Sequence, residues 1–289
     1  MKRVIYMVAA LMLTVSGFAQ TDTTKPHEPD TIKVGNFVIV KKNKSSNTLD
    51  TSNKNSQVLV DIGSGEGNSH YHYHAPLITT NWLIFDLGYA NWRDKTAYGS
   101  AEANEYLNAQ NGAHFTSDDL NLKNNKTSNV NIWLFMQKLN VISHVLNLKY
   151  GIGLEMYNWR YETNITYHKN PAYIYRDTIE FSKNKLATDY VTIPFMININ
   201  PFPHRRQGLS FSVGISAGYL YNSRNKQVSD ERGKQKIHSD FDLDPWRVAW
   251  VGEVGLGPVR VYGTYSINNL YQYGVKQYPY AVGLRFSNW

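Results

Sequence analysis

The sequence predicts an all-β fold, a closed antiparallel eight-stranded transmembrane β-barrel with a flexible N-terminal arm. Three observations predict it. The chain starts with a secretory signal, eight segments alternate between apolar residues and small or polar ones, and the last of these, residues 278–289, carries aromatic rings on its apolar face. A barrel in lipid exposes its apolar face and encloses its polar face, so this combination is typical of outer-membrane barrels.

Residues 1–19 read as a signal peptide. Lys2 and Arg3 precede an apolar stretch over residues 4–15, and small residues at Gly17 and Ala19 fit a cleavage site before Gln20. The apolar stretch is too short to cross a membrane as a helix. The chain has no cysteine, which excludes disulfides, thiolate chemistry and a lipid anchor on cysteine.

Residues 20–75 are expected to form a flexible periplasmic segment. They are rich in Thr, Asn, Ser, Lys and Gly, and few of them can bury against a core. The exception is residues 31–40, where two short apolar runs flank Gly35-Asn36, a dipeptide typical of a hairpin turn. An isolated hairpin is marginally stable in water. We therefore expect it to be mobile or to dock on a partner.

Residues 76–289 are predicted to form the barrel. The second strand has an ambiguous phase, because residues 133–136 are apolar throughout. In the third, the aromatic residues change phase at Tyr157, which predicts a bulge or an exit from the bilayer. In the fourth, Pro194 removes one ladder hydrogen bond. The predicted strands, each long enough to cross a bilayer when tilted, are residues 82–92, 130–139, 145–161, 190–199, 209–221, 247–256, 259–267 and 278–289.

The lengths of the connections predict the topology. Links after strands two, four and six are short, whereas residues 93–129, 162–189, 222–246 and 268–277 form longer links. This alternation is typical of periplasmic turns and extracellular loops. The sheet must close, because an open edge in lipid leaves backbone groups without partners. The alternative, a soluble lipocalin-like barrel, would turn its apolar face inward and the charged residues outward.

Seven charged residues fall on the inward phase of the predicted strands. An eight-stranded barrel is only wide enough inside for its own side chains, and an unpaired buried charge is costly. We therefore expect a salt-bridged plug, and the narrow lumen argues against an ion path or a catalytic pair. The seven residues are Asp86, Lys149, Glu155, Arg247, Glu253, Arg260 and Arg285.

A cluster of histidines precedes the first strand. His70, His72 and His74 alternate with tyrosines, so an extended chain presents all three imidazoles on one face. Neutral imidazole is a good ligand for Zn²⁺, Cu²⁺ or Ni²⁺, which makes these residues the candidate metal site. The alternative is an aromatic and polar lead-in at the membrane interface. No other cofactor is expected.

The long predicted loops carry two further candidates. His114, Ser117 and Asp118 offer the residue types of a hydrolase, although such triads are defined by spatial geometry. Loop tyrosines form a candidate surface for glycans or proteins, since tyrosine supplies contact area at low entropy cost. The alternative is the outer aromatic girdle of the barrel. These tyrosines are Tyr98, Tyr106, Tyr173, Tyr175, Tyr271 and Tyr273.

The composition restricts the partners. The formal net charge is +7, or +5 without Lys2 and Arg3, and the basic residues are scattered rather than interleaved with aromatics. This pattern argues against nucleic acid and suits anionic lipid head groups or glycans. The 21 Tyr and 7 Trp residues predict two aromatic girdles at the membrane interfaces.

Three short segments resemble a known family. Residues 85–92 (FDLGYANW) resemble the first-strand signature of PorT-like outer-membrane β-barrel proteins. Residues 30–36 (DTIKVGN) resemble the segment that precedes that barrel, and residues 193–195 (IPF) resemble one of its strands. The resemblance implies a barrel in an outer membrane. Some members assist protein secretion, and no catalytic residue is carried over.

These observations predict a non-enzymatic interaction or structural barrel in the outer membrane of a double-membraned bacterium, with a role in protein secretion or envelope assembly. The alternatives are a hydrolase with a loop-borne site acting on envelope lipid or peptide, and a narrow channel for small solutes. The expected partners are outer-membrane lipid and a periplasmic or cell-surface protein, and the barrel is expected to be monomeric.

Overall fold

A computed structural model describes residues 31–34, 37–40, 76–108, 114–203, 208–257 and 259–287. The chain divides into two units, residues 1–73 and 74–289, which are considered separately. The predicted signal peptide, most of the predicted arm and all three histidines of the candidate metal site (His70, His72 and His74) lie outside the described residues.

The described residues of the first unit form one pair of strands. β1 (Thr31–Val34) and β2 (Phe37–Val40) are antiparallel, with Thr31 opposite Val40 and Val34 opposite Phe37. The two strands occupy the two apolar runs on either side of Gly35-Asn36.

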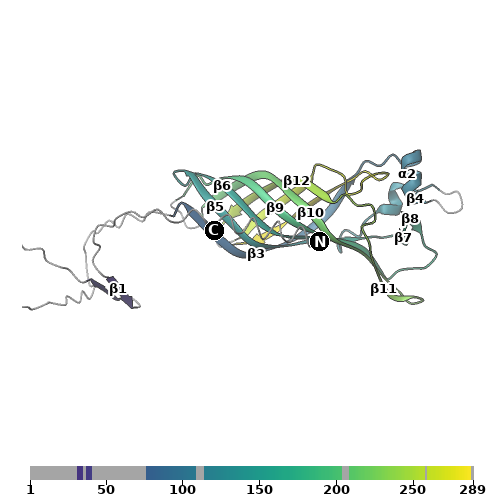
Figure 1. The fold of residues 1–289 in the computed structure, drawn as a ribbon, viewed down its shortest axis with the longest axis horizontal. Coiled ribbons are helices and arrows are strands. Elements are labelled where there is room, and N and C mark those ends of the chain that lie inside the picture. The colour runs from purple at the N-terminus through teal and green to yellow at the C-terminus, as the bar shows by residue number, and fades with distance from the viewer. Residues whose placement is uncertain are drawn as a thin grey trace, which may run out of the picture. The chain divides into compact units, whose positions relative to one another are not determined.

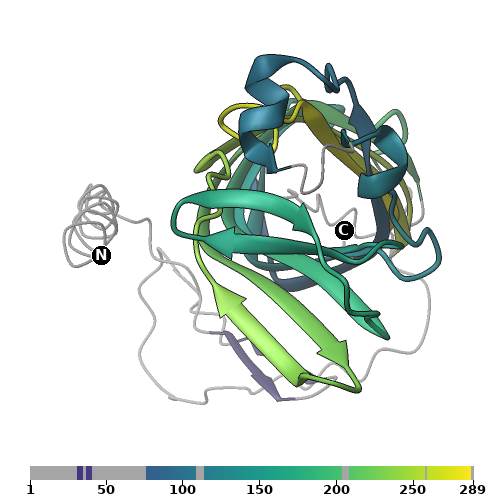
Figure 2. The same ribbon diagram turned by 90° about the vertical axis from the view of Figure 1, so that its right-hand side faces the viewer.

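The second unit contains a closed barrel of eight antiparallel strands (Figure 1), as predicted. Each strand pairs with the next along the chain, and the last pairs with the first, so the ring visible in Figure 2 has no free edge. This closure satisfies the backbone in lipid. The barrel strands are β3 (Ile78–Asp94), β5 (Ser128–Ile142), β6 (Leu146–Arg160), β9 (Lys183–Ile199), β10 (Leu209–Ser229), β12 (Trp246–Leu256), β13 (Val259–Ser266) and β14 (Gln277–Phe286).

The outer face of the barrel is apolar over its membrane-spanning part. Val213 is 59% exposed, Val282 52% and Phe286 48%. Their neighbours on the opposite phase, such as Ser212 and Arg285, are buried in the lumen. Apolar residues therefore face the surroundings and polar residues face inward, which is the reverse of a water-soluble barrel.

A bulge explains the ambiguous phase of the second strand. The pairing of β5 with β6 shifts by one residue between Trp133 and Phe135. As a result, Trp133 and Met136 are both buried inside, while Leu134 is exposed on the outer face. At Pro194, β9 continues as a strand and keeps its pairing with Ser216 of β10.

The barrel wall extends beyond the predicted strands at its extracellular end. β9 begins at Lys183, and β10 continues to Ser229 and pairs with β11 (Gly233–His238). Residues 222–229, 233–238 and 183–189 were expected in loops, and that expectation is wrong. These segments have polar outward residues, so they lack the apolar alternation used to predict membrane strands.

The sidedness of the wall reverses above the membrane. β6 continues to Arg160 with an unbroken alternation, so no bulge accompanies the change of aromatic phase at Tyr157. Tyr157 and Trp159 are buried inside the barrel, while Asn158 and Arg160 lie on the outer face. Water replaces lipid outside at this height, so the apolar residues belong in the interior.

The extracellular loops form a cap over this end of the barrel (Figures 1 and 2). They contain α2 (Ala101–Tyr106), whose first turn is capped by the Ser100 side chain, and the 3₁₀ helix η3 (Ser117–Leu120). A small sheet joins β4 (Leu107–Asn108), β8 (Ala172–Arg176) and β7 (Ile165–Lys169). Among the described residues, no helix is long and apolar enough to cross a membrane.

Candidate functional site

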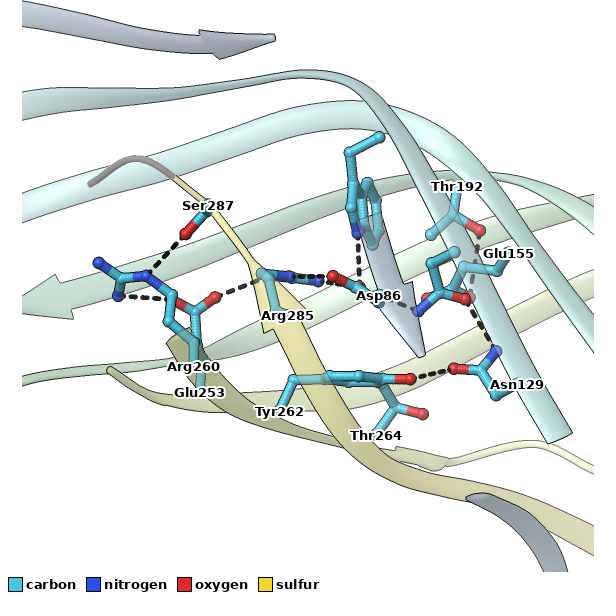
Figure 3. A network of polar contacts seen from close by, with 12 residues as sticks. Asp86, Asn129, Glu155, Thr192, Glu253, Arg260, Tyr262, Thr264, Arg285 and Ser287 are labelled. Atoms are coloured by element: carbon cyan, nitrogen blue, oxygen red, sulfur yellow. Dashed lines mark hydrogen bonds and ion pairs between the residues drawn. The ribbon is translucent and has the colours of Figure 1, made fainter. Parts of the chain in front are cut away.

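The lumen contains two groups of ion pairs. In the larger group, the Glu253 carboxylate accepts hydrogen bonds from three cations. The Lys149 ammonium donates at 2.7 Å, the Arg260 guanidinium at 2.8 Å and the Arg285 guanidinium at 2.7 Å. Each partner comes from a different strand, because the inward positions of β6, β12, β13 and β14 converge at this level of the lumen. Figure 3 shows Glu253 with Arg260 and Arg285.

Asp86 is the second carboxylate of this larger group. Arg285 binds it in a bidentate geometry, with Nε to Oδ1 and Nη2 to Oδ2 both at 2.8 Å. The indole of Trp133 donates to Asp86 Oδ2 at 2.7 Å. Asp86 and Arg285 lie directly opposite each other on β3 and β14, so this pair bridges the seam between the first and last barrel strands.

The second group is a single ion pair nearer the extracellular side. Arg247 Nη1 donates to Glu155 Oε2 at 2.8 Å, and Nη2 donates to Thr264 at 3.0 Å. The guanidinium also lies over the Tyr157 ring, 5.0 Å from its centroid, a geometry that stabilises a cation in a dry interior. The pair therefore lies where the charged part of the lumen meets the aromatic part.

The structure places all seven predicted charges inside the lumen and groups them as described. Four cations meet three carboxylates, so the seven residues carry a net charge of +1. Each is at most 6% exposed. Burial of so many charges is tolerable only because each has an ionic partner at hydrogen-bond distance.

Several further residues of the lumen, three of them neutral, were not predicted. Asn131 donates to Asp86, Asn129 donates to Asn131, and the Tyr262 hydroxyl donates to Asn129 at 2.6 Å. Lys138 lies directly opposite the inward Lys149 and therefore shares its face. Asn129 and Asn131 alternate along the second strand, and this alternation could have predicted that both face the lumen. The bulge between Trp133 and Phe135 shifts the alternation, so the inward direction of Lys138 could not be predicted.

Apolar and aromatic side chains fill the rest of the lumen. One cluster joins Ile84, Trp133, Met136, Met196 and Val251. A larger one lines the extracellular half and continues into the cap. Its buried aromatic members are Trp92, Tyr106, Phe115, Tyr157, Trp159, Tyr161, Tyr167, Tyr190, Phe241 and Tyr271.

Three tyrosine hydroxyls join the end of β6, β7 and the loop before β14 inside this larger cluster. Tyr161 and Tyr167 share a hydrogen bond of 2.5 Å, and Tyr167 and Tyr271 share one of 2.6 Å. Burial raises the pKa of Tyr167 and Tyr271 well above the usual value for tyrosine. The hydroxyls therefore stay protonated and can link three segments through one chain of hydrogen bonds.

The predicted tyrosine surface is only partly present. Tyr106 and Tyr271 are each 1% exposed and belong to the core of the cap, so they cannot contact a ligand at the surface. Tyr98, Tyr173 and Tyr175 are partly buried, and Tyr273 is exposed. Many of the aromatic residues that suggested two girdles, such as Tyr157 and Trp159, pack inside the barrel.

The predicted hydrolase residues do not form a triad. His114, Ser117 and Asp118 are exposed, and no hydrogen bond joins any two of these three described residues. Asp118 instead accepts a hydrogen bond from Asn121, and the His114 carbonyl accepts one from Arg176. In the described part of the chain, no group of three His, Cys, Asp or Glu residues could hold a metal ion.

Arg176, the last residue of β8, connects this strand to η3 through an ion pair with Asp119. Its Nε donates to Asp119 Oδ1 at 2.7 Å and its Nη2 donates to Asp119 Oδ2 at 2.8 Å, while the guanidinium lies over the Phe115 ring. Burial alone would raise the pKa of Asp119, but hydrogen bonds from Arg176 and Thr116 outweigh it and hold the pKa below its usual value. Asp119 is therefore charged at neutral pH and anchors this part of the cap.

Comparison with known proteins agrees with the fold. The family model for the outer membrane protein beta-barrel domain matches residues 96–272. The chain belongs to this outer-membrane β-barrel family. The family assignment places the protein in an outer membrane. The match supports the predicted outer-membrane barrel, but it does not identify the chain as a PorT-like protein.

The crystal structure of Ail, the attachment invasion locus protein of Yersinia pestis, is similar over 72% of this chain and 98% of that chain, with 8% identity and a TM-score of 0.28. Comparison with curated proteins gives no match.

Proposed function

We propose that this outer-membrane β-barrel is a non-enzymatic and non-conducting component of the envelope, which acts through the surfaces it presents on either side of the membrane. The observation that carries the proposal is the filled lumen. Ion pairs around Glu253 and Asp86 occupy one level, Arg247 and Glu155 a second, and the aromatic cluster continues from there into the cap. A solute or ion would have to break these contacts to pass.

Protein partners are the second part of the proposal. The residues before the barrel include the β1–β2 hairpin, whose two four-residue strands are too short to be stable alone in water. We propose that this hairpin docks on a periplasmic protein in secretion or envelope assembly, the role that the PorT-like resemblance implies.

Conductance tests the closed lumen. The full-length protein is inserted into planar lipid bilayers, and folding is verified by a shift in gel migration between boiled and unboiled samples. We expect no unitary current steps, because the lumen is blocked at several levels. Glu253→Ala serves as the comparison, since it removes the carboxylate shared by three cations. Regular steps in the wild-type protein that change in size in this variant would refute the closed lumen and support a channel.

A further inference from the structure

A row of four cations crosses the outer face of the barrel above the membrane. Arg160 of β6 lies directly opposite Lys185 of β9, Lys185 opposite Lys226 of β10, and Lys226 opposite Lys236 of β11. Residues opposite each other in antiparallel strands share a face. All four side chains therefore lie on one surface, which we call the cationic row.

The burial of the adjacent residues confirms that the side chains of the cationic row point outward. The adjacent cross-strand row contains Trp159, Leu186 and Asn225, all buried inside the barrel. The cationic row is thus on the outer wall, where the β10–β11 hairpin leaves the ring of strands in Figure 2.

The surface around the row is strongly basic. Lys183, Arg224 and Lys234 lie on the same face, each two residues along its strand from the row. Among residues 158–160, 183–189, 222–228 and 234–238, the only carboxylate is Asp189. It pairs with Arg224, so it does not neutralise the row.

The four cations of the row have no ionic partner among the described residues of the chain. The Lys185 ammonium donates to the Asn158 side chain, and Arg160 donates to the Ser182 carbonyl at 2.8 Å. Like charges directly opposite each other destabilise a sheet. Each of the seven predicted lumen charges has an ionic partner, so this unneutralised row on the same strands points to an anion from outside the chain.

The height of the row identifies the source of that anion. Arg160 lies four residues beyond Met156, the last apolar outward residue of β6. At a strand rise of about 3.3 Å per residue and a tilt of about 40°, this puts its backbone roughly 10 Å above the apolar band. Lipid head groups occupy roughly 5–8 Å on each side of the hydrocarbon. Long basic side chains bend back to this depth, and a sugar-bearing head group extends outward toward the row.

We propose that the cationic row binds the phosphate groups of a phosphorylated glycolipid in the outer leaflet. Arginine binds phosphate in a bidentate geometry and lysine binds it as a point charge. The site lies on the outer wall of the barrel, so it goes beyond the proposed function and does not depend on whether the lumen conducts.

Binding of a fluorescent lipid A, a doubly phosphorylated glycolipid, to the full-length protein in non-ionic micelles tests the proposal. The test variant is Lys185→Gln/Lys226→Gln/Lys236→Gln. The matched control, Arg93→Gln/Lys95→Gln/Lys276→Gln, removes the same charge from the β3–β14 side, across the barrel from β9 and β10. We expect the row variant to weaken binding about 100-fold, at about one kcal/mol per cation, and the control to weaken it less than about twofold.

Two further arms identify the ligand. Lipid A without its phosphates should bind the wild-type protein as weakly as intact lipid A binds the row variant. Lys185→Arg/Lys226→Arg/Lys236→Arg should retain binding, because charge is the property required. Equal losses in the row and control variants would overturn the proposal. So would heparin, a soluble sulfated glycan, or inorganic phosphate binding the row more tightly than lipid A does.

Folding of each variant is verified by gel migration of boiled and unboiled samples. Removal of opposed like charges should not destabilise the sheet. If the row variant nevertheless fails to fold, the salt dependence of lipid A binding to the wild-type protein tests the proposal instead. Binding through phosphates must weaken as NaCl rises, because salt screens exposed charges. An affinity that is independent of salt would overturn the proposal.

Discussion

At the scale of single residues, shared charges hold the strands of the lumen together. Arg285 binds two carboxylates at once, and Glu253 accepts hydrogen bonds from three cations. The inward phase of Glu253 and Arg285 follows from strand alternation alone. Their partners do not, because contacts across a barrel depend on the stagger between strands, which alternation leaves undefined.

Arg285→Ala tests the importance of this pairing. The substitution leaves Asp86 without an ionic partner in the lumen, and removing one member of a buried ion pair costs about 3–5 kcal/mol. We expect a lower urea midpoint for unfolding in micelles, followed by gel migration of unboiled samples. Arg93→Ala, an arginine on the exposed outer face of β3, should change stability by less than about 0.5 kcal/mol. Equal midpoints for the two variants would refute the structural role of Arg285.

At the scale of elements, the membrane strands were predictable and their extracellular extensions were not. The alternation of apolar and small residues identifies β10 up to Tyr221, where the outward residues are apolar. Beyond that point Arg224 and Lys226 take the outward phase, and the strand continues unrecognised to Ser229. A search for apolar outward residues necessarily stops where lipid gives way to water. The cap was likewise unpredictable, because its contacts join loops distant in sequence.

The ion pair between Asp119 of η3 and Arg176 of β8 should depend on pH. Folding lowers the pKa of Asp119, so its stabilising effect is complete above the unfolded value near 4 and is lost as pH falls through the folded value. We expect residues 114–122 to lose hydrogen-exchange protection, corrected for the intrinsic rate, between pH 7 and pH 3, while the membrane strands keep theirs.

Two substitutions separate Asp119 from its neighbour. Asp119→Asn should have low protection at both pH values, because the charge that binds Arg176 is gone. Asp118→Asn should behave as the wild type, since Asp118 contacts only Asn121 through its side chain among the described residues. Loss of the pH dependence in the Asp118 variant instead would show that the assignment to Asp119 is wrong.

At the scale of the whole molecule, the barrel combines two opposite arrangements in one wall. Within the membrane, polar residues are inside and apolar residues outside, and above it this order is reversed. The strand number, the closed barrel and the outer-membrane class followed from the sequence. The filled extracellular half did not, since its aromatic residues were expected at the membrane interface.

The role of the N-terminal segment is tested in the whole protein. All eight barrel strands lie within residues 78–286, so replacing residues 31–40 with a Gly/Ser segment of equal length should leave barrel assembly unchanged. We expect the amount of protein secreted by the cell to fall, because the hairpin is the proposed docking element. A Gly/Ser replacement of residues 45–54, outside the hairpin, is the matched control. Unchanged secretion in the hairpin variant would contradict this role.

The ion pair between Asp86 and Arg285 joins residues 199 positions apart. Asp86 is made 199 residues before its counter-charge, so a chain that stops short of Arg285 has a lumen carboxylate without its ionic partner. Such a chain also lacks the strand that seals the ring. A truncated product therefore lacks a neutralising charge in its lumen and the hydrogen bonds of its closing strand at once.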